Sequence, residues 1–214
     1  MEKENYKKAK TSNENLENED TNEVLIQGRI VKKVERPYIV VLTISTGWAT
    51  TEPSYVKVHC FDKCKEEASS YNQYDYVMIK GRIQSYAKNP NIKHQLTLLV
   101  SAEEVLPPKS SFSNSIGRTY YEGKNSFALS GRIVSVKSSD KSNAVYLVIR
   151  AQKGGHPSFV HATYYPYNVE KATSELKKNR YAYFRGYVNG STTPDKNGVY
   201  SHNQYYIVNE VHFI

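Results

Sequence analysis

Two stretches of the chain place aromatic rings and basic or histidine side chains at alternating positions. They are Tyr55–Phe61, with the sequence YVKVHCF, and Phe159–Tyr165, with the sequence FVHATYY. Alternate residues of an extended strand point to opposite faces, so the small apolar residues enter a core while the rings and cations face outward. Flat rings can stack on any base, and cations can neutralise phosphates. The pattern therefore suits a surface that stacks nucleic-acid bases.

Further rings and cations lie near these stretches in the sequence. Some fall in expected loops, and two lysines lie on the expected first strand. The full set of candidate nucleic-acid-binding residues is Trp48, Tyr55, Lys57, Phe61, Tyr86, Lys88, Lys93, Lys32, Lys33, Phe159, His161, Tyr165 and Tyr200. The alternative for Tyr55 and Phe61 is a small core at the barrel end or a dimer interface. For each lysine the alternative is an ordinary solvated charge. Arg29 and Arg132 are open between a structural role and a phosphate contact.

The composition favours a polyanionic partner. The net charge is +8, and residues 107–214 hold fourteen Lys or Arg against six Asp or Glu. Nineteen tyrosines suit positions that are half buried and half wet. The tyrosines of the second half could equally form a self-association surface.

Several function classes are disfavoured by the residues themselves. Cys60 and Cys64 lack a second cysteine pair or clustered histidines to complete a zinc site, so we expect reduced thiols, with Cys60 buried and Cys64 on a helix. The six histidines are scattered, and no phosphate-cradling glycine loop is present. We expect a protein that is not an enzyme and needs no cofactor or metal. A signal-peptide core and a long apolar run are also lacking, which predicts a soluble, cytoplasmic protein without membrane contact.

Short strands and one helix are expected to position the first set of residues. Apolar and alternating runs predict strands over 24–34, 38–45, 55–61, 76–83 and 95–102. A helix from Asp62, as its cap, to about Ser70 separates the third and fourth strands. Gly28 interrupts the first strand where a small barrel must bend sharply. Residues 1–21, which offer almost nothing to bury, are expected to be a disordered tail.

The second half of the chain repeats this pattern. The run Gly-Arg-Ile-Val recurs identically at an offset of 103, and Phe159 falls on Tyr55 at an offset of 104. Two copies of one domain are the simplest explanation. The expected organisation is a first domain over 22–106, a Pro- and Ser-bearing linker over 107–124 and a second domain over 125–214.

Within the second domain, two features stand out. A helix is expected to begin after an Asn168 cap and run to Asn179. Residues 189–203 form the longest expected loop of either domain, which makes them a candidate lid.

The predicted fold class is all-β, with one short helix per domain and two tandem five-stranded Greek-key barrels. Five strands with a helix between the third and fourth is the order of the OB-fold, whose strands 2–3 face and flanking loops bind oligonucleotides. The segment 22–106 resembles the bacterial single-stranded DNA-binding protein (SSB) family. The opening run Asn22–Ile30, the aromatic-led third strand, the exit Phe61-Asp62-Lys63 into a helix and the run Val77–Arg82 match in type.

This resemblance implies stacking roles for named residues. It places Trp48, Tyr55 and Phe61 on bases, and through the internal repeat Phe159 and Tyr165 as well. The chain departs from the family by lacking its acidic, glycine-rich tail and by holding two barrels, as in the two-barrel members that dimerise. Partners of the acidic tail and the oligomeric state therefore cannot be transferred, although a dimer is favoured.

The expected function is coating of single-stranded DNA with little sequence preference, in replication, recombination or mobile-element transfer. One alternative is an OB-fold interaction module of a replication or conjugation assembly that binds protein through the Tyr-rich second barrel. A second alternative is an RNA-binding barrel.

Overall fold

The computed structural model describes residues 20–47, 53–87, 96–113, 119–139, 141–153, 155–194 and 200–214. Within these ranges the chain consists of strands and two short helices. The elements are β1 (Asn22–Arg36), β2 (Ile39–Ser45), β3 (Tyr55–Cys60), α2 (Asp62–Ser69), β4 (Tyr76–Ala87), β5 (Leu96–Leu106), β6 (Ser111–Ser113), β7 (Thr119–Tyr121), β8 (Lys124–Ser138), β9 (Val145–Lys153), β10 (His156–Tyr164), α3 (Val169–Glu175), β11 (Tyr181–Pro194) and β12 (Tyr200–Phe213). The all-β prediction is confirmed.

The strands close into rings in the same order twice. In the first unit β1, β2, β3, β5 and β4 follow one another, and β4 pairs back with β1. In the second unit β8, β9, β10, β12 and β11 do the same, and β11 pairs back with β8. Each ring is antiparallel except at one closing pair, where Val58 faces Val100 and Ala162 faces Tyr206 in parallel register. This order is that of the OB barrel, as predicted.

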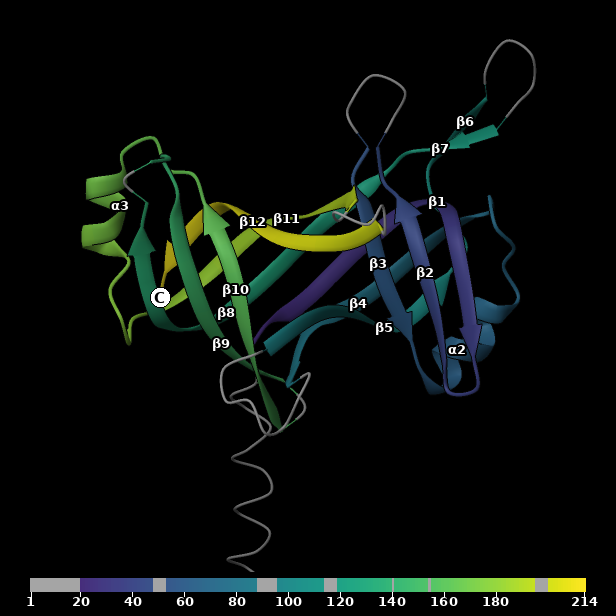
Figure 1. Cartoon of the computed structure of the whole chain (residues 1–214), viewed down its shortest axis with the longest axis horizontal. Helices are drawn as coiled ribbons and strands as arrows, with labels where there is room; N and C mark the ends of the chain where they lie inside the picture. Colours follow the sequence, from purple (N-terminus) through teal and green to yellow (C-terminus); the bar gives the residue numbers. More distant parts are fainter. Residues whose placement is uncertain are drawn as a thin grey trace, which may run out of the picture.

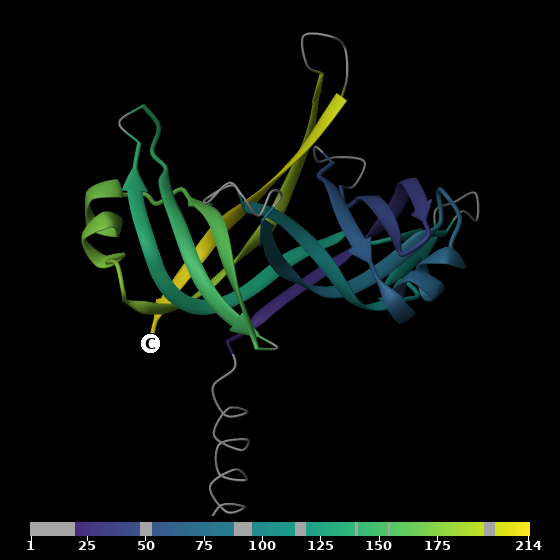
Figure 2. The same ribbon diagram turned by 60° about the horizontal axis from the view of Figure 1, so that its bottom comes forward.

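The two units are joined through their first strands. β1 pairs with β8 in antiparallel register, from Asn22 opposite Leu129 to Gln27 opposite Lys124. The antiparallel pairing relates the units by an approximate two-fold axis, with α2 and α3 at opposite outer ends (Figure 1). The long β11–β12 hairpin extends from the second unit toward the first, as a second view makes clear (Figure 2).

Two side-chain amides, buried at Asn22 and half-buried at Asn125, occupy equivalent positions in the two units. Asn22 donates to Ile83 O at 2.8 Å and accepts from Ile83 N at 2.9 Å. Asn125 makes the same pair of bonds to Val188, at 2.7 and 2.9 Å. Each amide lies on a first strand and satisfies the backbone of a fourth strand, where an unpaired buried group would cost stability. The internal repeat is thus visible in side-chain hydrogen bonds as well as in sequence.

Register shifts recur at equivalent positions too. β4 shifts between Lys80 and Gly81, and β11 between Arg185 and Gly186. Bulges of this kind bend a strand and increase its twist, which a small barrel needs in order to close. At Gly28 in β1 an added Cβ would overlap the carbonyl oxygen of Ser45, so the backbones approach too closely for any side chain.

Alternation along the strands builds the core. Val56, Val58 and Cys60 of β3 are fully buried, and they belong to one cluster of buried residues that extends through both units. Cys60 and Cys64 are free, with Cys60 buried and Cys64 on α2, as expected; Cys64 is buried as well. Burial raises the pKa of the Cys60 thiol to about 12, which keeps it protonated and unreactive at neutral pH.

Several boundaries differ from the prediction. Much of the expected loop 189–203 is paired strand. β11 runs to Pro194, which pairs with Tyr200 at the start of β12. The described part of this segment is a strand pair and not a loop lid. Asp62 does not cap α2: Phe61 holds the N-cap position, without a side-chain hydrogen bond. Asn168 does cap α3 by accepting from Lys171 N at 2.8 Å, although that helix ends at Glu175.

The expected tail and linker lie partly within the described residues. Asp20, at the end of the expected tail 1–21, exchanges two backbone-directed hydrogen bonds with Gln152, at 2.7 and 2.9 Å; residues 1–19 lie outside the described ranges. The expected linker 107–124 contains the β6–β7 hairpin. Gln27, which is fully buried, binds it through Lys109 and Glu122 at 2.7–2.8 Å.

Candidate nucleic-acid interface

The outward face of β1, β2 and β3 carries a row of cations. Register places Lys32 opposite Thr43, and Thr43 opposite Lys57, so the two lysines flank one threonine on the same face. Burial, and then the charge of Lys32, lowers the pKa of Lys57. Lys32 and Lys57 repel each other across β2, so a bound anion would stabilise both charges. The phosphates of a nucleic-acid backbone are such anions.

His59 and Phe61 continue this face. The His59 and Phe61 rings are nearly parallel, with centroids 6.5 Å apart and an angle of 15° between their planes. Phe61 is 38% exposed, whereas His59 is largely enclosed. Burial, followed by the charge of Lys57, lowers the pKa of His59 from its ordinary value of 6.5. His59 is therefore a neutral support for the Phe61 ring at pH 7.

Tyr55 and Tyr86 lie at the two ends of this region. Tyr55 begins β3 and is half buried. Tyr86 lies near the end of β4 and is 46% exposed. Both rings are partly exposed to solvent, which is compatible with the predicted stacking roles.

Lys33 has a different role from the predicted phosphate contact. Its ammonium donates to Ser69 O and Tyr71 O, each at 2.7 Å, and forms an ion pair with Glu35 at 2.6 Å. These three partners use all three ammonium hydrogens at the end of α2. Lys33 therefore stabilises the helix C-terminus, where orphan carbonyls favour a cation.

The second unit presents a corresponding face with other residues. His161 is exposed on β10 opposite Val148, and Tyr165, just beyond the strand, is 59% exposed. Phe159 is half buried, and its backbone faces Arg150, which in turn faces Arg132 of β8. This face therefore keeps rings and cations but distributes them differently from the first.

Four predicted residues lie partly or wholly outside the described ranges. Trp48, Lys88 and Lys93 fall in segments that the structure does not describe, and Tyr200 begins β12 with a side chain outside the description. Their proposed contacts with nucleic acid stay predictions.

The β11–β12 hairpin contacts the start of β3, which the sequence did not predict. Ser54 Oγ donates to Val188 O at 2.8 Å and accepts from Gly190 N at 3.0 Å, and Gln204 Oε1 accepts from Lys57 N. We name this contact the closed junction. Of its residues, Gly190 comes from the segment 189–203 that was expected to be a loop, and Val188 and Gln204 lie just outside that segment. The threonines and tyrosines near Gly190 and Gln204 were the available signal for strands.

The equivalent contact lies between β4 and β10, and we name it the open junction because a groove lies beside it. There Ser85 Oγ accepts from Phe159 N at 2.9 Å. Ser85 and Gly190 occupy equivalent places in their units, four residues after the bulge glycines Gly81 and Gly186.

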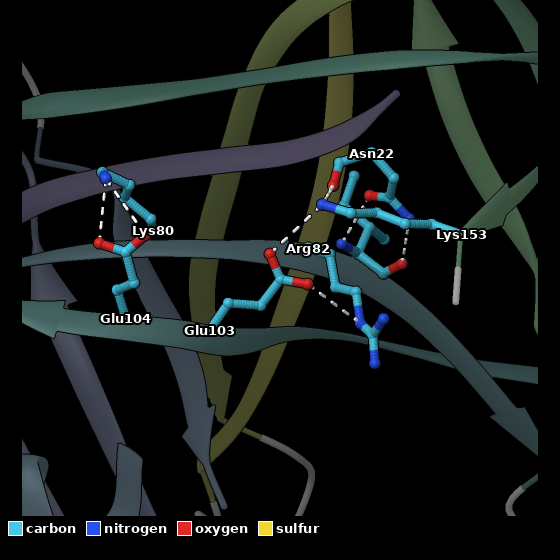
Figure 3. A network of polar contacts seen from close by, with 7 residues as sticks. Asn22, Lys80, Arg82, Glu103, Glu104 and Lys153 are labelled. Atoms are coloured by element: carbon cyan, nitrogen blue, oxygen red, sulfur yellow. Dashed lines mark hydrogen bonds and ion pairs between the residues drawn. The ribbon is translucent and has the colours of Figure 1, made fainter. Parts of the chain in front are cut away.

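Two further cations, also missed from sequence, lie beside the open junction. Lys153 of β9 donates to Asn22 O and Glu103, both at 3.3 Å, and Glu103 also pairs with Arg82 at 3.6 Å (Figure 3). Glu103 thus holds one cation from each unit at the same edge. A lone Lys at the end of a strand carries no sequence signal for such a contact.

Two features are absent from the described residues. In that part of the chain no group of three or more His, Cys, Asp or Glu side chains is placed to hold a metal ion. Among the described residues, neither helix has the length and apolarity needed to cross a membrane.

The fold is shared with solved structures of single-stranded DNA-binding proteins. The wild-type single-stranded DNA binding protein from Thermus aquaticus matches with a TM-score of 0.66 and 15% identity, over 92% of this chain and 94% of that chain. A deletion mutant of the same Thermus protein matches with a TM-score of 0.65 and 16% identity, over 92% and 95% of the two chains. No protein-family model and no curated protein sequence matches the chain. At this identity the similarity shows a common fold.

Proposed function

We propose that this protein coats single-stranded DNA with little sequence preference. The observation that carries the proposal is the outward face of β1–β3, where Lys32 and Lys57 form a cationic row that leads to the exposed Phe61 ring. Stacking on rings and attraction to phosphates are both independent of base identity. The common fold with the Thermus protein supports the same assignment.

Within this proposal the second unit, Trp48 and the loop lysines extend the binding surface. We place the protein in the cytoplasm, in DNA replication, recombination or mobile-element transfer, as a non-enzymatic dimer. The basic second half of the chain supports a DNA-facing role for both units.

A titration with oligo-dT tests the proposal. Binding should quench the fluorescence of Trp48, the single tryptophan, and should weaken steeply as salt rises because counterions are released. Duplex DNA of the same length serves as the control and should bind more weakly. A flat response to salt, or equal affinity for the duplex, would contradict the proposal. Matched RNA in competition decides whether DNA is the preferred strand.

A second candidate function rests on the exposed tyrosines of the second unit. Tyr146 and Tyr165 are 48% and 59% exposed, and Tyr167 is fully exposed. Tyrosine is enriched at protein interfaces. An interaction module would show a mass increase with a protein partner and no change with oligonucleotide, as measured by light scattering after size exclusion.

A further inference from the structure

A groove of about 470 Å³ lies at the open junction. It is bordered by β3, β4 and β5 of the first unit and by β9 and β10 of the second. Its rings and apolar side chains are Phe61, Tyr86, Ile39, Leu99 and Pro157. The volume falls within the range of about 300–1,000 Å³ typical of sites for small organic groups. Two aromatic walls next to apolar side chains suit a flat, poorly hydrated ring.

The groove is continuous with the outward face already described. His59 and Phe61 belong both to that face and to the groove wall. Across the groove, Pro157 and Ser158 begin β10, whose outward side carries His161. A strand that runs from the face of the first unit to that of the second would therefore pass through this groove.

Charge at the groove edge favours an anion. Arg82 and Lys153 both line the groove, and Glu103, which pairs with both, fixes them in place (Figure 3). The three groups together carry one net positive charge. A phosphate can approach these cations while its attached base enters between the rings.

Two polar groups of the wall are already engaged, whereas His59, Gln84 and Ser158 also line it. Both ends of the Asn22 amide are bound to Ile83, and Ser85 Oγ already accepts from Phe159 N. Stacking on the Phe61 and Tyr86 rings, which every base allows, does not depend on these polar groups.

We propose that this groove is a nucleotide subsite where bound single-stranded DNA crosses from the first unit to the second. The base stacks on Phe61 and Tyr86, and its phosphate lies against Lys153 and Arg82. The inference rests on the proposed function, and it assigns to the junction of the units a contact that neither barrel can make alone.

The test compares Tyr86→Ala with the control Tyr167→Ala, which removes a fully exposed ring far from the groove lining. Affinities are measured for oligo-dT of increasing length by fluorescence anisotropy, and thermal unfolding checks the fold. For strands long enough to reach both units, Tyr86→Ala should weaken binding roughly 5- to 100-fold, as expected for one lost stacking contact. The shortest strands that bind, and the control variant, should change less than about 2-fold.

The outcomes separate the subsite from the function. If the wild-type protein binds oligo-dT but Tyr86→Ala matches it at every length, or loses the same factor at every length, the crossing subsite is wrong and the proposed function stands. If the wild-type protein binds no oligonucleotide, the proposed function itself fails.

Photocrosslinking keeps the proposal testable even if Tyr86→Ala does not fold. The wild-type protein is irradiated with oligo-dT carrying 5-iodouracil, and the crosslinked peptides are mapped by mass spectrometry. Crosslinks to Phe61 or Tyr86 are expected with long strands. Crosslinks found exclusively at other residues would overturn the subsite.

Discussion

The two junctions between the units use equivalent strands but are packed differently. At the closed junction the Ser54 hydroxyl bridges β3 and β11, and the backbones lie so close that a Cβ added to Gly190 would overlap the carbonyl oxygen of Tyr55. At the open junction the equivalent residue is Ser85, whose hydroxyl lies between β4 and Phe159 N. Each junction is thus bridged by one serine hydroxyl, and the groove lies at the junction where Ser85 replaces the glycine. The comparison teaches that equivalent strands of the two units can meet with a glycine on one side and a side chain on the other.

The largest effect is expected from adding a side chain at the closed junction. Gly190→Ala should destabilise the protein by about 3 kcal/mol, because the new methyl group cannot fit without moving the hairpin or β3. Chemical denaturation measures the change. The matched variant Ser85→Ala loses one hydrogen bond and should cost about 1 kcal/mol. Equal costs for the two variants would contradict the proposed difference between the junctions.

Removal of the Asn22 and Asn125 amides should have a slightly smaller effect, and a similar one in the two units. Asn22→Ala and Asn125→Ala each leave a buried N–H and C=O of the fourth strand without their partner, at Ile83 and Val188. We expect a loss of about 2 kcal/mol from either change. Thermal or denaturant unfolding of both variants measures it. A large difference between them would show that the units differ in their interiors and not only at their junctions.

The outward faces can be compared through Lys57 and His161, which are equivalent by the repeat. Lys57→Gln should weaken binding of oligo-dT several-fold at low salt, and it should reduce the slope of log affinity against log salt by about 0.7. His161→Gln, the change at the equivalent position of the second unit, should alter both values less than Lys57→Gln does. The salt series measures both. An unchanged slope for Lys57→Gln would remove this lysine from the phosphate path.

The smallest effect concerns pH. Burial and the nearby Lys57 lower the folded-state pKa of His59 below its ordinary value of 6.5. Between these two pKa values the unfolded chain binds a proton that the folded protein does not, so stability falls as pH decreases through 6.5 toward the folded value. Unfolding at pH 7.5 and 5.5 measures the loss.

The control for this effect is His59→Gln, which should show a weaker dependence of stability on pH. Bound oligo-dT should also weaken the pH dependence of stability in the wild-type protein, because a phosphate near Lys57 and His59 favours the protonated histidine. An identical pH dependence in the variant would assign the effect to other groups, such as His202, whose pKa burial and Lys57 also lower.

Much of the fold could be predicted because its signals are local. The alternation of Tyr55–Cys60 fixes which face is buried, and the repeated run at Gly28 and Gly131 marks equivalent first strands. The Asn168 cap could likewise be predicted, because its partner Lys171 is three residues away.

What could not be predicted depends on contacts between distant residues. Ser54 meets Gly190 across more than a hundred residues, and the place of Lys153 beside Glu103 depends on how the two rings of strands are joined. Lys33 was misjudged because an exposed lysine and one bound to Ser69 O are alike in sequence. The candidate stacking residues were predicted by type, whereas the groove that combines two of them required the structure.

The pairing of β1 with β8 has a genetic consequence. In an assembly of two identical subunits, one substitution would alter both junctions at once. Here both halves belong to one chain, so Ser85 and Gly190 are encoded separately and each junction can change without the other. Covalent duplication therefore lets a nearly symmetric molecule evolve one side for adhesion between its halves and the other for contact with a ligand.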